Sequence, residues 1–277
     1  MSHLVLSTQD EQLLIDLHTH IYLDFDYINA HIYPDYHDQS TYNRLQKFAK
    51  NGYIRSEFIP IPRKSTDRAG KVFTLDKFGV EVTEELLGEV HWKKQWTDRV
   101  PAFAYHSIML AYIAKEMQRV SDNEDIPIEM KEWVNEARAF YQYTSARSDM
   151  LRPDAVSVVG KKAHDDNNFG LFLELERSHS KRQTVIKKVR RYNDFMKQGD
   201  KAFHGYDEKV LFEHPVSSWK LIFIAMDNTR LKRIMRYLQQ EKFEHIEIVV
   251  TTYDDILKNP FGRIYRSPDD PDTLVTL

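Results

Sequence analysis

The chain contains no cysteine, and this absence removes several classes of chemistry. It excludes disulfides, thiol nucleophiles and zinc or iron–sulfur sites built on cysteine. No apolar run approaches the roughly 18 residues that a membrane-spanning helix needs. The N-terminus also lacks the basic start and long apolar core of a secretory signal. We therefore expect a cytoplasmic protein that does not contact a membrane.

Lys and Arg are missing from the first 39 positions, which hold seven acids. Residues 40–77 then hold nine Lys or Arg against three acids, and residues 181–201 hold eight against two. The net charge of −3 conceals this uneven distribution. Basic segments in a slightly acidic chain suggest that a polyanion is held at particular faces.

The first 90 residues predict three helices followed by a hairpin. Leu13, Leu14 and Leu17 share a helix face that begins after Ser7 or Thr8. The further predicted elements are a short helix capped by Asp24 and closed by Pro34, a helix from Asp38 or Ser40 to Asn51-Gly52, strands over 53–59 and 71–75, and a helix over 77–88. This order is typical of a winged helix-turn-helix with its wing at 60–70. The alternative is a small helical domain with an incidental hairpin.

The remainder of the chain predicts a mixed sheet flanked by helices. We expect helices over 102–120, 181–198 and 228–240, and strands over 155–160, 170–176, 219–226 and 246–252. Residues 126–145 fit either a helix or an extended segment. The predicted class is α+β, with a winged-helix domain at 1–90, an α/β domain with a mixed sheet at 91–260 and a loose tail at 261–277.

The third predicted helix and the wing carry the candidate DNA contacts. Early residues of this helix meet base edges in helix-turn-helix proteins, and Arg, Asn and Thr are side-chain types that read bases. Lysines further along the helix and cations of the wing are placed to contact phosphates. The candidates are Ser40, Thr41, Tyr42, Asn43, Arg44, Lys47, Lys50, Arg63, Lys64, Arg68 and Lys71. A solvated charged face and a protein-docking module remain alternatives.

Two carboxylate clusters next to apolar runs form the candidate chemical site. Asp154 follows a proline, and Glu174 and Glu176 lie two apart in a predicted strand, which places them on one face. Asp154 and Glu174 are the types of ligand that Mg²⁺ takes in metal-dependent nucleases. The lysine expected two residues after Glu174 is replaced by Glu176. The alternative is a structural ion-pair cluster in which Lys188, Arg191 or Arg152 compensates the acids.

The predicted helix at 181–198 is rich in Lys and Arg. Lys181, Lys188 and Arg191 lie close to one face, and Tyr192 follows Lys188 by one turn. Phosphate binding and plain solubility explain these cations equally well.

Together these segments resemble the replication-relaxation family of plasmids and integrative elements, mainly of Gram-positive bacteria. The resemblance spans roughly residues 8–240 and rests on the early winged helix, Ala104-Tyr105-His106, Arg152-Pro153-Asp154, the segment from Phe172 to Arg177 and the helix from Lys188 to Tyr192. It implies a C-terminal domain similar to the restriction-endonuclease, or PD-(D/E)xK nuclease, fold. The motif lysine falls on Glu176, and Lys188 is the best candidate for a lysine that has migrated.

The resemblance implies a DNA-binding accessory role in plasmid replication, relaxation or conjugative transfer. We expect double-stranded DNA as partner, together with relaxase or replication proteins, and a homodimer is compatible with the winged helix. The loss of the motif lysine favours a second domain without catalysis. The rivals are an active Mg²⁺-dependent endonuclease that uses Asp154, Glu174 and Lys188, and a transcription repressor whose second domain dimerises.

Overall fold

The structure is a computed structural model, and it describes residues 4–58, 70–97, 101–147, 149–165, 167–178 and 180–277. The chain divides into two compact units, Met1–Tyr112 and Ile113–Leu277. The division falls within helix α5 (Pro101–Ser121), beyond the boundary near residue 90 that the sequence predicts. Most of the predicted wing, residues 60–69 with Arg63, Lys64 and Arg68, lies outside the described residues.

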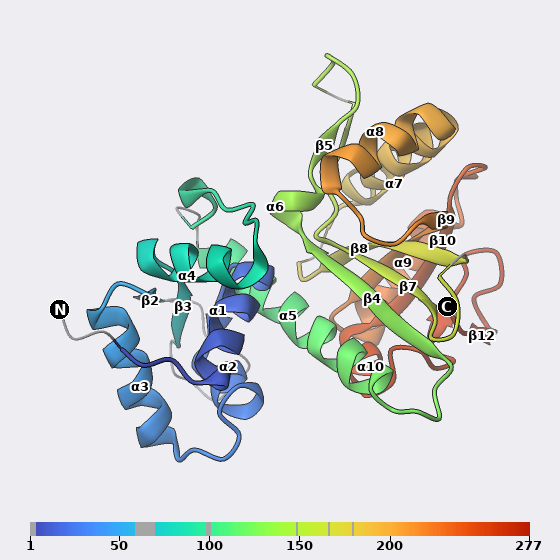
Figure 1. Ribbon diagram of the computed structural model, residues 1–277. Coiled ribbons are helices and arrows are strands. Elements are labelled where there is room, and N and C mark those ends of the chain that lie inside the picture. Colours follow the sequence, from blue (N-terminus) through green and yellow to red (C-terminus); the bar gives the residue numbers. More distant parts are fainter. Residues whose placement is uncertain (1–3, 59–69, 98–100, 148, 166, 179) are drawn as a thin grey trace. The chain divides into compact units, whose positions relative to one another are not determined.

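The N-terminal unit contains the predicted helices and hairpin in the predicted order (Figure 1). Ser7 and Asp24 cap the first two helices, as expected from their positions. The described elements are α1 (Thr8–His20), β1 (Leu23–Asp24), α2 (Phe25–His31), α3 (Asp38–Lys50), β2 (Ile54–Phe58), β3 (Lys71–Leu75), α4 (Lys77–Leu87) and the 3-10 turn η1 (Lys94–Trp96). The three strands pair antiparallel in the order β1-β3-β2.

A buried carboxylate, Asp10, joins α1 to the segment that follows α2 and to α3. Asp10 has no exposed surface and accepts hydrogen bonds from Ser7 N (2.7 Å), Tyr33 OH (2.7 Å) and Arg44 Nε (2.9 Å). Burial acts to raise the pKa of Asp10, but the hydrogen bonds from Arg44, Ser7 and Tyr33 outweigh it and leave the pKa below its ordinary value. The ionised carboxylate therefore fixes where α3 lies on the unit.

The C-terminal unit is built on a mixed sheet, which confirms the prediction from sequence. Among the described residues seven strands pair in the order β12-β11-β10-β9-β8-β7-β4. The central pairs β8–β9 and β9–β10 are parallel, whereas β4–β7 and β7–β8 are antiparallel. The elements are β4 (Ile128–Asn135), α6 (Glu136–Ala139), β5 (Tyr141–Gln142), β6 (Met150–Leu151), β7 (Ala155–Lys161), β8 (Asn168–Glu176), α7 (Arg182–Lys197), α8 (Asp200–Val210), β9 (Val216–Ala225), α9 (Asn228–Leu238), β10 (Glu247–Thr252), α10 (Tyr253–Lys258), β11 (Tyr265–Arg266) and β12 (Leu274–Val275).

Helices α7 and α9 pack on the same face of this sheet. Each connects two neighbouring parallel strands, and successive right-handed crossovers in one direction place their helices on one side. Val189 of α7 and Ile234 of α9 belong to one buried cluster with Phe172 of β8. Since side chains on a strand alternate, Glu174 and Glu176 point to this face as well.

The structure settles one segment that the sequence leaves open and corrects the expectation for another. Residues 126–145, which the sequence leaves ambiguous, form the edge strand β4, the single turn α6 and the short β5. The tail beyond Pro260 is not loose, because β11 pairs with β10 and β12 pairs with β11. Tyr265 anchors it: the ring is fully buried and its hydroxyl donates to the carbonyl of Pro260 at 2.6 Å.

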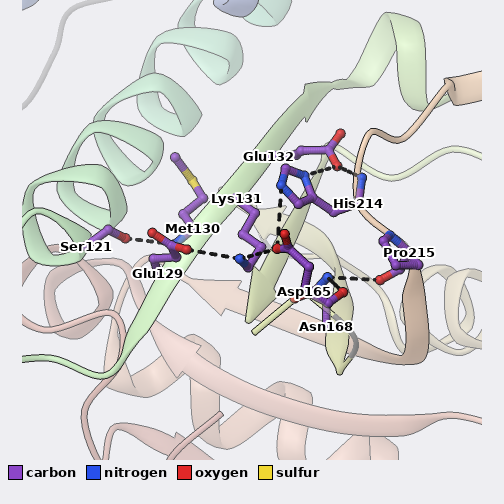
Figure 2. A network of polar contacts seen from close by, with 9 residues as sticks. All are labelled: Ser121, Glu129, Met130, Lys131, Glu132, Asp165, Asn168, His214 and Pro215. Carbon is purple, nitrogen blue, oxygen red and sulfur yellow. Dashed lines mark hydrogen bonds and ion pairs between the residues drawn. The ribbon is translucent and has the colours of Figure 1, made fainter. Parts of the chain in front are cut away.

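A polar network holds two connections against the edge strand β4 (Figure 2). Lys131 Nζ lies 2.6 Å from Asp165 Oδ1, and His214 Nδ1 lies 2.9 Å from Glu132 Oε1. Strand β4 has a bulge between Met130 and Glu132. The bulge allows the consecutive side chains of Lys131 and Glu132 to take part in the same network. The network fixes the β7–β8 turn and the segment before β9, so it stabilises the register of β8.

Asp10→Asn is expected to lower the free energy of unfolding by about 3 kcal/mol, because it leaves Arg44 without its buried counter-charge. The pKa of Asp10 is lower in the folded than in the unfolded state, so the stability that Asp10 contributes is lost as pH falls through the folded pKa. The difference in unfolding free energy between wild type and variant should therefore shrink at acidic pH. Urea unfolding at neutral and acidic pH measures both effects. The exposed control Asp35→Asn should change stability by no more than about 0.5 kcal/mol. Equal stabilities of the two variants would contradict the role of Asp10.

Candidate nucleic-acid interface and buried carboxylate site

Helix α3 presents one polar, basic face to solvent. Ser40, Asn43, Lys47 and Lys50 follow one another at spacings of three and four residues and are all exposed. Residues at these spacings are neighbours on a helix surface. The opposite face is apolar, with Leu45 and Phe48 fully buried. Four of the predicted contact residues therefore form one continuous stripe.

Two other predicted contact residues face inward. Thr41 is fully buried on the side of Leu45, and its hydroxyl donates to Asn29 Oδ1 at 2.6 Å. Arg44 is engaged with Asp10, and it also donates to the carbonyl of Val5 at 2.9 Å. These two side chains support the position of α3 and are not available to read bases in this arrangement.

Tyr42 and Lys71 connect α3 with the hairpin. Lys71 Nζ lies 3.2 Å from the Tyr42 hydroxyl and 5.1 Å from the centre of its ring. Both side chains are exposed. The first residue of β3 thus lies beside the N-terminal half of α3 and extends its basic surface toward the hairpin.

In the C-terminal unit, Lys188 of α7 lies between the two glutamates of β8. Its Nζ is 2.7 Å from Glu174 Oε2 and 2.7 Å from Glu176 Oε1. Both carboxylates are almost entirely buried, whereas about a third of the lysine side chain is exposed. This geometry confirms that the glutamates share a face, and of the three cations that the sequence offers as their partners it places Lys188 between them.

Asp154 joins this cluster through the backbone of β8. Its Oδ2 accepts the N–H of Leu175 at 2.7 Å, and that residue lies between the two glutamates. Tyr192 completes the cluster by donating to Glu174 Oε1 at 2.5 Å. A cavity of about 280 Å³ borders the site; it is lined by Glu136, Arg152, Asp154, Glu174, Lys188, Arg191 and Tyr192.

The charges of the cluster depend on one another. Burial raises the pKa of Glu174 to about 7, and Asp154 adds to this while Lys188 opposes it. Burial alone would lower the pKa of Lys188, but Glu174, Asp154 and Glu176 raise it above its ordinary value. Lys188 is therefore held as a cation, and its charge is what allows the acids to remain buried.

The predicted Mg²⁺ ligands, Asp154 and Glu174, accept hydrogen bonds from protein groups in this arrangement. Both oxygens of Glu174 are engaged, one by Lys188 and the other by Tyr192. Among the described residues there is no group of three or more His, Asp or Glu side chains that could hold a metal ion. The ammonium group of Lys188 supplies the positive charge that a bound metal ion would otherwise supply.

Several site residues were not expected from sequence. The sequence marks Tyr192 only by its spacing from Lys188, although a polar residue one turn from a lysine that faces buried acids is well placed to bind them. Ser180, whose hydroxyl donates to Glu176, and Glu136, which pairs with Arg152 at 2.8 Å, carry no motif. Asp10 was missed because its partner Arg44 is 34 residues away.

Comparison with protein families gives a match that agrees with the resemblance noted from sequence. The replication-relaxation family matches residues 14–207. A comparison with curated proteins found no match. In the part of the chain that the structure describes, no helix is long and apolar enough to cross a membrane.

Three solved structures with some similarity are those of restriction endonucleases. FokI is 11% identical with a TM-score of 0.32, and the similarity covers 92% of this chain and 44% of FokI. FokI bound to DNA is 12% identical with a TM-score of 0.28, covering 90% of this chain and 43% of that chain. SdaI is 10% identical with a TM-score of 0.25, covering 90% of this chain and 88% of SdaI. The chain thus spans less than half the length of FokI, and TM-scores this low do not establish a shared fold.

Lys188→Met is expected to lower the free energy of unfolding by roughly 3–5 kcal/mol at pH 8, because two buried carboxylates lose their cation. Without the cation the folded pKa of Glu174 rises further above its unfolded value. Glu174 of the folded variant then takes up a proton as pH falls. The loss of unfolding free energy relative to wild type is therefore smaller at pH 5 than at pH 8. Denaturant unfolding at both pH values measures this.

The double variant Lys188→Met/Glu174→Gln should regain part of the loss at pH 8, since one of the uncompensated charges is removed. The neighbouring exposed lysine provides the control: Lys187→Met should change stability by less than about 0.5 kcal/mol. If Lys188→Met and Lys187→Met unfold alike at both pH values, the ion-pair cluster does not stabilise the unit.

Proposed function

The chain belongs to the replication-relaxation family, and we propose that it is a DNA-binding accessory protein in the replication, relaxation or conjugative transfer of a plasmid or mobile element. The family itself suggests a replication-related function of such an element. The exposed residues of α3 and the buried carboxylate site supply the physical basis for the more specific proposal of a DNA-binding accessory role. Each unit contributes a different part of it.

We assign DNA recognition to the N-terminal unit, as a winged helix-turn-helix. The order α1-β1-α2-α3-β2-β3, with the strands paired as β1-β3-β2, supports this assignment. In that motif α3 is the helix that enters the major groove. The hairpin β2–β3 would border the wing, in which Arg63, Lys64 and Arg68 remain predicted phosphate contacts.

The observation that carries the proposal is the exposed stripe on α3. Asn43 lies near its start, where base edges would be met, and Lys47 and Lys50 follow one and two turns later. Lys71 adds a cation beside the helix. The proposed contact set is Ser40, Tyr42, Asn43, Lys47, Lys50 and Lys71, since Thr41 and Arg44 are occupied within the protein.

We assign the C-terminal unit a nuclease-like scaffold that binds DNA or a partner without cleaving. The order β4-β7-β8-α7-β9, with acids at the start of β7 and the end of β8, supports the likeness to such nucleases. The engagement of Glu174 by Lys188 and Tyr192 supports the absence of catalysis. A carboxylate bound in this way is not free to ligate a metal or to activate water.

Lys47→Gln/Lys50→Gln in the full chain is expected to weaken duplex binding and to lower its salt dependence. Each lost phosphate contact should reduce the slope of log Kobs against log[salt] by about 0.9, so the double variant should lose nearly two units. Fluorescence anisotropy with a labelled duplex, measured over a range of salt concentrations, gives the slope.

Lys93→Gln/Lys94→Gln is the matched control, because it removes two exposed cations of the same unit that are not part of α3. Its slope should remain close to that of the wild type. A common slope for both double variants would show that α3 does not contact phosphates and would remove the main support for the proposal.

A second candidate function is an active Mg²⁺-dependent endonuclease, favoured by the position of Lys188 beside Glu174. We expect supercoiled plasmid to remain intact when it is incubated with the protein and Mg²⁺ or Mn²⁺, because the acids are already neutralised. Asp154→Ala should behave like wild type in this assay. Cleavage by the wild type that Asp154→Ala abolishes would establish the nuclease and refute the accessory role without catalysis.

A further inference from the structure

The C-terminal unit has a strongly uneven charge distribution that the carboxylate site does not explain. Residues 181–197 and 228–238, which form α7 with its capping lysine and α9, contain eleven Lys or Arg and one acid, Asp194. The remainder of residues 113–277 contains sixteen Lys or Arg and twenty-six acids. The unit is neutral as a whole, so its positive charge is concentrated on two helices.

These two helices form one surface. Their inner sides belong to the same buried cluster over the sheet. Arg182 and Arg190 of α7 both pair with Glu241, just beyond the end of α9, at 2.9 and 2.8 Å. Asn193 of α7 also accepts the backbone N–H of His245 at 3.0 Å. The outer side of α7 is thus continuous with the segment that follows α9.

Most of the cations on this surface point to solvent. Lys188 is engaged with the glutamates, and Arg191 lines the cavity beside them. Exposed cations remain at seven positions, which we call the basic face: Lys181, Arg182, Lys187, Arg190, Lys197, Lys232 and Arg236. Glu241 is a single carboxylate shared by two of these cations. Within the part of the chain that the structure describes, no ion pair neutralises Lys187, Lys232 or Arg236.

The side chains around these cations narrow the choice of partner. The aromatic and large apolar side chains of α7 and α9 are buried or half-buried, and none is among the exposed ones. Single-stranded nucleic acid is bound largely by stacking of bases on aromatic rings, which this face does not offer. A helix that lies in a membrane surface inserts apolar side chains, and these are also absent from the face. Cations without apolar neighbours suit the phosphate backbone of a duplex.

We propose that the basic face of α7 and α9 is a second DNA-binding surface, which contacts the phosphates of duplex DNA without reading sequence. The inference rests on the proposed DNA-binding function and extends it to the C-terminal unit. α3 would supply sequence recognition and part of the affinity. The basic face would add affinity that depends on salt and not on base sequence.

The test compares three full-length proteins that differ in where charge is removed. The face variant is Lys187→Gln/Lys232→Gln/Arg236→Gln, which keeps good helix-forming residues at exposed positions. The control variant is Lys161→Gln/Lys209→Gln/Lys258→Gln, which removes three exposed cations of the same unit outside the face. Both variants carry the same net charge, so a difference between them reports location and not total charge.

Anisotropy titrations of a labelled random-sequence duplex over a range of salt concentrations provide the measurement. We expect the face variant to lose between two and three units of slope and to bind at least about tenfold more weakly at 0.1 M salt, with the control within one unit of wild type. Equal slopes for the face and control variants would overturn the proposal. Matching circular dichroism spectra and melting temperatures verify that all three proteins are folded.

Two further outcomes separate this inference from the proposed function. Wild type that binds no duplex at low salt would refute both. Duplex binding that depends on Lys47 and Lys50 but not on the basic face would overturn only this inference. Vesicles of phosphatidylserine and phosphatidylcholine test a lipid surface directly: a face variant that loses vesicle binding but keeps its duplex slope would show that the partner is a membrane.

Discussion

The burial of two carboxylates on one face of β8 is the constraint on which the C-terminal unit depends. Glu174 and Glu176 point toward α7, where water cannot solvate them, so the helix must supply a cation at the right position. Lys188 supplies it, and Tyr192, one turn later, satisfies the remaining oxygen of Glu174. With these two side chains directed inward, the helical repeat directs Lys187 and Arg190 outward. One interaction thus sets both the inner site and the outer surface of α7.

Helix α3 of the N-terminal unit is likewise divided into an inner side that pairs with an acid and an outer side that carries cations. Asp10 engages Arg44 on the inner side of α3, and the outer side is left with Asn43, Lys47 and Lys50. In both units a buried ion pair positions a helix, and other cations of that helix face solvent. Buried pairs contribute little net stability compared with apolar packing, but breaking one is costly, so each helix is held in a defined position. A chain with a net charge of −3 can in this way present two positive surfaces.

Much of this fold was predictable because its signals are local. Ser7, Asp24 and Asn51-Gly52 define helix ends through caps, and the strands of the central sheet are continuous apolar runs. A cation beside the acids was predictable, with Lys188 as one of three candidates, because a strand face and a helix turn restrict the positions of both partners. The contacts of Asp10 were not predictable, because they join residues far apart in sequence. The pairing of β11 and β12 was not predictable either, because these very short strands only extend an existing sheet edge. The burial of Thr41 could have been found from its spacing to Leu45 and Phe48, but the polar residues around it favoured an exposed position.

The central claim is that localised positive charge makes this molecule bind duplex DNA. The most direct measurement is the affinity of the unaltered full-length protein for a random-sequence duplex as a function of salt. We predict binding at low salt and a linear fall of log Kobs with log[salt], with a slope of several units, as expected when several phosphates are contacted. Absence of binding at low ionic strength, or an affinity that does not depend on salt, would contradict it.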